Sequence, residues 1–316
     1  MTTPSEQGLS KGPPRTVLSV RDLRMNYGTK EVLRGVDFSV HQGEVVVLLG
    51  PNGAGKSTTI EILEGFRSRT AGDVEVLGTD PDHADEVWRA RIGIVLQSWR
   101  DHGRWSVAEL LGHFADFYTP YSTPGRTRPR DVTEVIATVG LSDHADQRIS
   151  TLSGGQRRRL DVAIGILGNP DLLFLDEPTA GFDPSARRDF HQLVRRLADE
   201  DTTILLTTHD LDEAERLADR VLILNRGRIH ADGTIAQLAE QVGAGTVVRW
   251  KRDGRRHSEN VGDSTEFIRG LLAENGDAVS DIEVVRADLE DVYLDMVGQG
   301  ESERGTASEE FSGGSR

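Results

Sequence analysis

The chain contains no cysteine among its 316 residues. This absence excludes disulfide bonds, a thiol nucleophile and cysteine-ligated metal sites, and it indicates nothing firm about the compartment. No apolar run approaches the roughly 18 residues needed to span a bilayer, and residues 1–14 are polar, unlike a signal peptide. We therefore expect the chain to stay in the cytosol unless a partner holds it at a membrane.

Basic residues are also in short supply. The 37 Lys and Arg residues are outnumbered by 52 Asp and Glu residues, which gives a formal net charge of −15. This balance argues against binding a nucleic-acid backbone as the main task, so no nucleic-acid partner is expected. The composition, 36% hydrophobic and 28% charged, is that of a soluble globular protein. The length allows one large α/β domain and a smaller one.

The stretch Gly50–Ser57 fits the pattern G-x-x-x-x-G-K-[ST]. It lies between an apolar run at Val45–Leu49, typical of a buried strand, and a helix-like segment at Ser57–Gly65. Its glycines allow the backbone to curl around a polyphosphate and point N–H groups inward. Lys56 would place a charge at the β- and γ-phosphates, and Ser57 would offer a hydroxyl to Mg²⁺. A chance glycine-rich turn is the alternative, and the flanking elements argue against it.

A second apolar run, Leu172–Asp176, ends in the carboxylate pair Asp176 and Glu177. Phosphate-loop enzymes place a Mg²⁺ ligand at such a strand end, although an acidic pair before Pro178 could simply begin a turn. We favour Asp176 as a Mg²⁺ ligand, through water, and Glu177 as the group that polarises the attacking water. A strand at Thr203–Thr207 would bring His209 to the same crevice, although a lone histidine is usually structural.

Two further features are ambiguous when taken alone. Leu152–Gln156 reads LSGGQ, and Ser-Gly-Gly before a helix is common loop chemistry. Paired glycines at a helix N-terminus can nevertheless receive an anion, which gives the chain a second phosphate-binding surface. One nucleotide does not need both surfaces from the same subunit. Tyr27, just before a turn, could stack on adenine, although an aromatic residue in this place is more often explained by ordinary strand packing.

In this order the motifs resemble the nucleotide-binding subunits of ABC (ATP-binding cassette) transporters, over roughly Val17–Glu240. The matching positions are Tyr27 as the adenine-stacking aromatic, Gly50–Thr58 as Walker A, Gln97 as the Q-loop, Leu152–Gln156 as the signature, Leu172–Glu177 as Walker B, Ala180–Asp183 as the D-loop and His209 as the switch histidine. Phe182 stands where this family more often has leucine, a conservative apolar exchange.

The resemblance implies a set of site residues. Those that would bind ATP are Tyr27, Gly50, Pro51, Asn52, Gly53, Ala54, Gly55, Lys56, Ser57, Thr58, Ser153, Gly154, Gly155, Gln156 and Asp183. The catalytic groups would be Lys56, Gln97, Glu177 and His209. Mg²⁺ would be held by Ser57, Gln97 and Asp176.

The resemblance also implies a fold of the α/β class, a P-loop NTPase cassette with a RecA-like parallel core sheet, an antiparallel β part and a helical insert. The expected organisation is a flexible tail at 1–15, the nucleotide-binding domain at 16–242 with its helical insert at about 98–152, an accessory domain at 243–297 and a disordered tail at 298–316.

The C-terminal part resembles the ABC-2 type exporter ATPases typified by the daunorubicin-resistance ATP-binding protein. The supporting features are a hairpin around Asp253-Gly254, a helix-like 266–274, a strand-like 282–285 and a closing motif at Leu289–Leu294. Together they predict a small α+β module. The basic residues of the hairpin, Arg249–Arg252 with Arg255 and Arg256, could contact lipid headgroups, but we favour a solvated hairpin.

The implied function is hydrolysis of MgATP between two such subunits arranged head to tail. A separate integral-membrane permease would dock on the helical insert and export a drug, a lipid or another hydrophobic compound. The chain would then lie peripherally on the cytoplasmic face of the membrane. A soluble ABC-type ATPase acting on ribosomes or DNA remains an alternative, disfavoured by the single cassette and the modest gap between its motifs. A phosphate-loop kinase is disfavoured by the signature and by His209.

Overall fold

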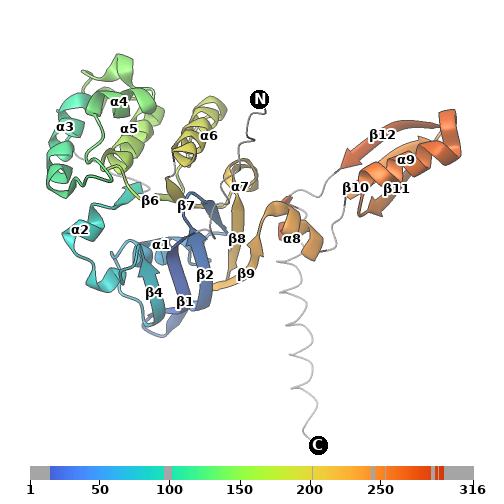
Figure 1. Cartoon of the computed structure of the whole chain (residues 1–316), viewed down its shortest axis with the longest axis horizontal. Helices are drawn as coiled ribbons and strands as arrows, with labels where there is room; N and C mark the ends of the chain where they lie inside the picture. The colour runs from blue at the N-terminus through green and yellow to red at the C-terminus, as the bar shows by residue number, and fades with distance from the viewer. Residues whose placement is uncertain are drawn as a thin grey trace, which may run out of the picture. The chain divides into compact units, whose positions relative to one another are not determined.

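The computed structural model describes residues 15–95, 102–200, 202–242, 246–252, 254–285, 289–290 and 292–294 (Figure 1). Gln97, Asp253 and both predicted tails, except Arg15, lie outside these ranges. The chain divides into two compact units. Unit 1 comprises Met1–Val45 and Ser57–Thr207, and unit 2 comprises Val46–Lys56 and Thr208–Arg316.

Unit 1 begins with an antiparallel sheet whose described strands follow the order β2-β1-β4. These strands are β1 (Thr16–Tyr27), β2 (Lys30–His41) and β4 (Ala71–Val76). Strand β1 continues past Val20 through a bulge. Asp22 adopts φ 44°, and its backbone N–H donates to the Asp37 carboxylate at 2.9 Å. The bulge absorbs the polar residues, so that Leu23 and Met25 still point into the core.

Three strands of unit 1 are parallel and in register: β5 (Ile92–Val95), β6 (Leu172–Asp176) and β7 (Thr203–Thr208, whose last residue belongs to unit 2). Leu172 pairs with Ile92 on one side and with Thr203 on the other. Parallel strands covered on both faces are apolar throughout, as the sequence of β6 indicates. A Cβ at Gly93 would collide with the carbonyl oxygen of Gly165, so glycine is needed where helix α5 lies against β5.

Helices α3 and α4 of the helical insert pack against each other and against α5 (Figure 1). Their bounds are Val107–Tyr118, Val132–Thr138 and Gly154–Leu167. Helix α3 begins at a capping box, in which the side chains of Ser106 and Glu109 each accept from the other residue's backbone N–H. Helix α5 begins at Gly154, because Ser153 and Gln156 form a second capping box. The other described helices of unit 1 are α1 (Lys56–Leu63), α2 (Glu86–Arg89) and α6 (Pro184–Asp199). The first residue of α1, Lys56, belongs to unit 2. Short 3₁₀ turns lie at Pro81–His83, Thr119–Tyr121, Ser142–His144 and Ile149–Thr151.

Unit 2 has a core of its own. Strand β3 (Val45–Leu49) is parallel to β8 (Arg220–Asn225), and β8 is antiparallel to β9 (Arg228–Gly233). Arg220 and Asp232 join β8 to β9 through an ion pair of 2.5 Å. Unit 2 also contains helices α7 (Leu211–Leu217) and α8 (Ile235–Gln241). Over the described residues of this unit, the strands are neighbours in the order β3-β8-β9.

The C-terminal module of unit 2 is a small antiparallel sheet with one helix (Figure 1). It contains β10 (Thr246–Arg252), β11 (Arg255–Val261), α9 (Ser264–Asn275), a 3₁₀ turn (Gly276–Ala278) and β12 (Val279–Val285). Its core is formed by Val248, Trp250, Val261 and Leu271. The predicted hairpin and α+β composition are confirmed. None of the described helices is long and apolar enough to cross a membrane.

The chain returns from this module to helix α7. Residues 289–290 and 292–294 are helical, and Leu289 and Val292 are fully buried. The backbone N–H of Leu289 donates to the Glu215 carboxylate on α7 at 2.5 Å. The closing motif, which the sequence assigns to the accessory domain, therefore contacts a helix that precedes that domain.

Candidate functional site

The glycine-rich loop in unit 2 has the geometry of a phosphate cradle. Gly53 and Gly55 adopt φ of 81° and 113°, values that favour glycine, and the loop leads directly into α1. A Cβ at Gly50 would collide with the carbonyl oxygen of Leu224, so this glycine is also required for packing. Lys56 is 4% exposed and donates to the carbonyl oxygens of Gly50 at 2.7 Å and Pro51 at 3.3 Å. These bonds hold its ammonium group within the loop.

A hydroxyl and a carboxylate meet in unit 1. Ser57 Oγ lies 3.4 Å from Asp176 Oδ1, at the end of β6, so that two of the predicted Mg²⁺ ligands are in contact. Thr207 donates its hydroxyl hydrogen to the same Asp176 oxygen at 2.5 Å. Sequence reasoning missed Thr207, which lies on the neighbouring strand β7. Its side chain fixes the Asp176 carboxylate beside Ser57.

Glu177 is held by its backbone in a conformation that non-glycine residues rarely adopt, with φ 42°. Its N–H lies 3.0 Å from Thr207 Oγ1 and 3.2 Å from the Thr207 carbonyl oxygen. Buried Arg158, on α5, donates to the carbonyl oxygens of Asp176 at 3.2 Å and Pro178 at 2.8 Å. Arg158 therefore ties the helix of the signature motif to the turn that carries Glu177. The sequence carried no signal for this contact.

Glu64, which follows α1, is a further carboxyl group that sequence reasoning missed. It is 4% exposed, and burial, with the charges of Asp176 and Glu61, raises its pKa to about 8. A carboxyl group in this environment is stable in the protonated form at neutral pH.

The signature residues form a well-ordered helix start with open space around it. Ser153 caps α5 because its Oγ accepts from the Gln156 backbone N–H at 3.3 Å, and the side-chain Oε1 of Gln156 accepts from the Ser153 N–H at 2.8 Å. A Cβ at Gly154 would meet no atom within 4 Å, and at Gly155 the nearest would be Ala186 Cβ at 3.8 Å. Packing within the chain therefore does not require glycine at Gly154. The hydrogen bonds of Ser153 join it to Gln156 and not to Ser57 or Asp176.

Tyr27 and Asp183 each contact neighbouring groups of the chain. Tyr27 is 40% exposed at the end of β1, and the Arg67 guanidinium lies 5.0 Å from its ring centroid. This leaves a partly exposed ring beside a cation. Asp183 caps α6 by accepting from the N–H groups of Ser185 and Ala186, and these bonds lower its pKa. His209 belongs to unit 2, directly follows β7 and is exposed, whereas Gln97 lies outside the described residues.

The residues fit a Mg²⁺ ion held with few protein ligands. The described residues contain no group of three or more His, Asp and Glu side chains placed to hold a metal. Ser57 and Asp176 nevertheless offer a hydroxyl and a carboxylate oxygen 3.4 Å apart. Mg²⁺ prefers oxygen ligands and is commonly held by one or two carboxylates together with substrate phosphates and water.

A phosphate loop after a buried strand and a carboxylate at the end of a parallel strand define a P-loop nucleoside triphosphatase. The chain matches the family described as ABC transporter over residues 33–180. It is 37% identical over 272 residues to the Nod factor export ATP-binding protein I of Ralstonia nicotianae, covering 85% of this chain and 79% of that one. It is 38% identical over 250 residues to the daunorubicin/doxorubicin resistance ATP-binding protein of Streptomyces peucetius, covering 78% and 74%.

A solved structure described as the ATP binding subunit of an ABC transporter matches with a TM-score of 0.62 and 26% identity, covering 82% of this chain and all of that one. The chain belongs to the ABC transporter family and is an ATPase. The predicted family and fold class are confirmed.

Proposed function

We propose that this chain hydrolyses MgATP to drive export of a drug-like, lipid-like or other hydrophobic compound through a separate integral-membrane permease. The relatives named for Nod factor export and for daunorubicin/doxorubicin resistance support this class of cargo. These relatives are named as ATP-binding proteins, which supports a transport path formed by a second protein. The chain would act at the cytoplasmic face of the membrane.

The observation that carries the catalytic proposal is the contact of Ser57 and Thr207 with Asp176, next to Glu177. Ser57 and Asp176 would hold Mg²⁺ together with Gln97, which would supply positive charge next to the β- and γ-phosphates. Glu177, fixed by its two backbone bonds to Thr207, would orient and polarise the attacking water. Lys56 and the loop N–H groups would stabilise charge on the transferring phosphoryl group, and His209 would contact the γ-phosphate.

We further propose that Ser153, Gly154 and Gly155 complete the ATP site of a second copy of this chain, in a head-to-tail dimer. The open space around Gly154, which the chain's own packing does not use, supports this arrangement. The N–H groups at the start of α5 are suited to a γ-phosphate brought by the partner. Tyr27 would provide a stacking face for adenine.

The test compares Glu177→Gln with Lys56→Ala. Glu177→Gln should retain ATP binding and lose turnover by at least about 100-fold, because it removes the group that polarises water. Lys56→Ala should lose binding as well, because it removes a charge from the β/γ-phosphates. An exposed carboxyl far from the site, Glu134→Gln, is the matched control and should keep wild-type turnover. Full turnover by Glu177→Gln would remove that residue from its role.

Co-purification from membranes tests the partner. An integral protein should accompany the wild-type chain, and its absence under conditions that preserve the folded ATPase would argue for a soluble machine instead.

A further inference from the structure

A polar cavity lies in unit 1, at the edge of the sheet where β5 and β6 begin. Its volume is about 240 Å³, and Arg15, Arg91 and Arg126 line it together with Glu75 and Asp171. Arg91 directly precedes β5 and Asp171 directly precedes β6. Because β6 is five residues long at roughly 3.3 Å per residue, the cavity is about 16 Å from Asp176 at its other end. It is therefore separate from the proposed Mg²⁺ site.

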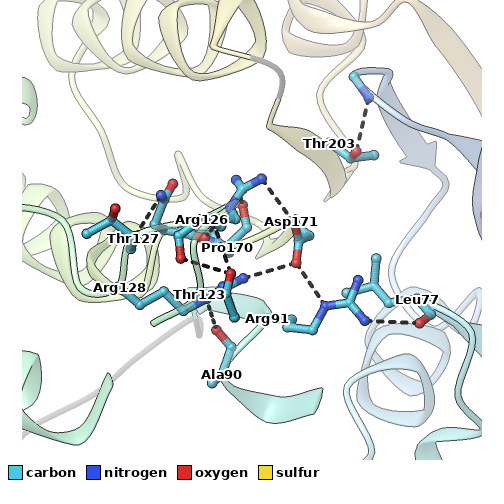
Figure 2. Close-up of polar contacts among 12 residues, drawn as sticks. Leu77, Ala90, Arg91, Thr123, Arg126, Thr127, Arg128, Pro170, Asp171 and Thr203 are labelled. Atoms are coloured by element: carbon cyan, nitrogen blue, oxygen red, sulfur yellow. Dashed lines mark hydrogen bonds and ion pairs between the residues drawn. The ribbon is translucent and has the colours of Figure 1, made fainter. Parts of the chain in front are cut away.

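Three guanidinium groups converge on the single carboxylate of Asp171 (Figure 2). The Asp171 oxygens lie 2.9 Å from Arg91 Nε, 3.0 Å from Arg126 Nη1 and 3.1 Å from Arg128 Nη2. The Arg128 side chain is only 4% exposed. One carboxylate cannot neutralise three permanently charged groups, so the cluster keeps an excess of positive charge.

The excess positive charge costs free energy in this cluster, because few water molecules can solvate the buried guanidinium group. Burial lowers the pKa of Arg128, Asp171 opposes this change, and the charges of Arg126 and Arg91 add to it. Arg15 brings another cation to the cavity wall, and Glu75 provides one further carboxylate. An anion in the cavity would relieve the repulsion among the guanidinium groups.

The donors are also held in position. Arg126 donates to the carbonyl oxygens of Asn169 at 2.7 Å and Pro170 at 2.5 Å, and Arg91 donates to that of Leu77 at 3.3 Å. Over the described chain, no hydrogen bond uses Nη2 of Arg91. Fixed donors lose little conformational entropy when a ligand binds, which is the condition for a specific site.

We propose that this cavity binds a phosphate-type oxyanion, either free phosphate or the phosphoryl group of a small metabolite. At about 30 Å³ per water molecule it has room for roughly eight waters, enough for either ligand. Guanidinium groups suit this ligand because their paired N–H donors match the oxygens of phosphate. The site would join the loop that carries Arg126 and Arg128 to the starts of β5 and β6.

The experiment titrates the full-length chain with inorganic phosphate, and separately with glycerol 3-phosphate, by calorimetry at constant ionic strength. Excess Mg²⁺ and a non-hydrolysable ATP analogue occupy the phosphate loop, so that its affinity for phosphate does not contribute. Arg15→Gln removes an exposed cation and Glu75→Gln an exposed carboxylate from the cavity wall. Matched controls with the same charge changes elsewhere in unit 1 are Arg21→Gln and Asp116→Asn, both exposed.

We expect one saturable site per chain at millimolar or lower ligand. Arg15→Gln should weaken binding roughly threefold to tenfold, and Glu75→Gln should tighten it by a similar factor. A folding defect cannot produce the second result. Binding of phosphate alone identifies the free ion as the ligand, and equal binding of glycerol 3-phosphate identifies a phosphoryl group. The proposal fails if neither ligand binds saturably, or if the control variants change the affinity as much as the cavity variants do.

Discussion

Replacing Glu64 by glutamine should stabilise the protein above neutral pH and leave it unchanged near pH 4. Glu64 is 4% exposed, and burial, with repulsion from Asp176 and Glu61, raises its pKa from 4.5 to about 8. In the unfolded chain it ionises at its ordinary pKa, so between these two values only the folded protein keeps the proton. Stability therefore falls as the pH rises through this window.

The size of the effect follows from the two pKa values. At about 1.4 kcal/mol per pKa unit, the folded state loses roughly 3 kcal/mol by pH 7 and roughly 5 kcal/mol above pH 8, compared with acid conditions. Glutamine has the shape of the protonated carboxyl group and does not titrate. The stability difference between Glu64→Gln and wild type should thus grow from about zero to these values.

The assay is chemical denaturation of both proteins at intervals between about pH 4.5 and pH 9, with EDTA and without nucleotide. Asp161, whose pKa burial raises to about 6, titrates in both proteins and cancels in the difference. The exposed Glu134→Gln is the control and should parallel wild type. A Glu64→Gln difference that is the same at both ends of the range would refute the assignment of a buried proton to Glu64.

Three further predictions concern other parts of the chain. Asp171→Asn leaves three guanidinium groups without their carboxylate and should lower the free energy of unfolding by about 3 kcal/mol, measured by urea denaturation; an unchanged midpoint would contradict the charge argument. Ser106→Ala removes the cap of α3 and should cost about 1 kcal/mol in the same assay, with no loss of ATP affinity. Mixing inactive Lys56→Ala and Ser153→Arg subunits should restore ATP occlusion at about one site per dimer, because a shared interface places both defects in one site; no recovery despite verified subunit exchange would argue against the head-to-tail dimer.

Much of the fold could be predicted because its signals are local. The phosphate loop lies within eight residues of sequence, and the capping box at Ser106 spans one helical turn. The apolar run of β6 indicates a strand buried on both faces. The start of α5 is harder to place from sequence, because two glycines suggest a loop, whereas the Ser153 cap places them in the first helical turn.

The residues that position the candidate site could not be predicted, because their partners are distant in sequence. Thr207 is 31 residues from Asp176 and Arg158 is 18 residues away, and neither residue type marks such a contact. Glu64 looks like an ordinary polar residue at a helix end, and the sequence does not reveal the burial that raises its pKa. Sequence patterns thus identify the groups that touch the nucleotide in this family, but not the side chains that hold them.

The contact between Leu289 and Glu215 changes how the end of the chain should be engineered. The C-terminal module is anchored on both sides, by α8 before it and by the Leu289 contact with α7 after it, so it is an insertion rather than an appendage. Cutting the chain near Val242 would also remove Leu289 and Val292, two fully buried side chains. A short flexible linker in place of residues 246–285 would keep them. Such a loop replacement would distinguish the function of the module from the packing role of Leu289 and Val292, which follow it.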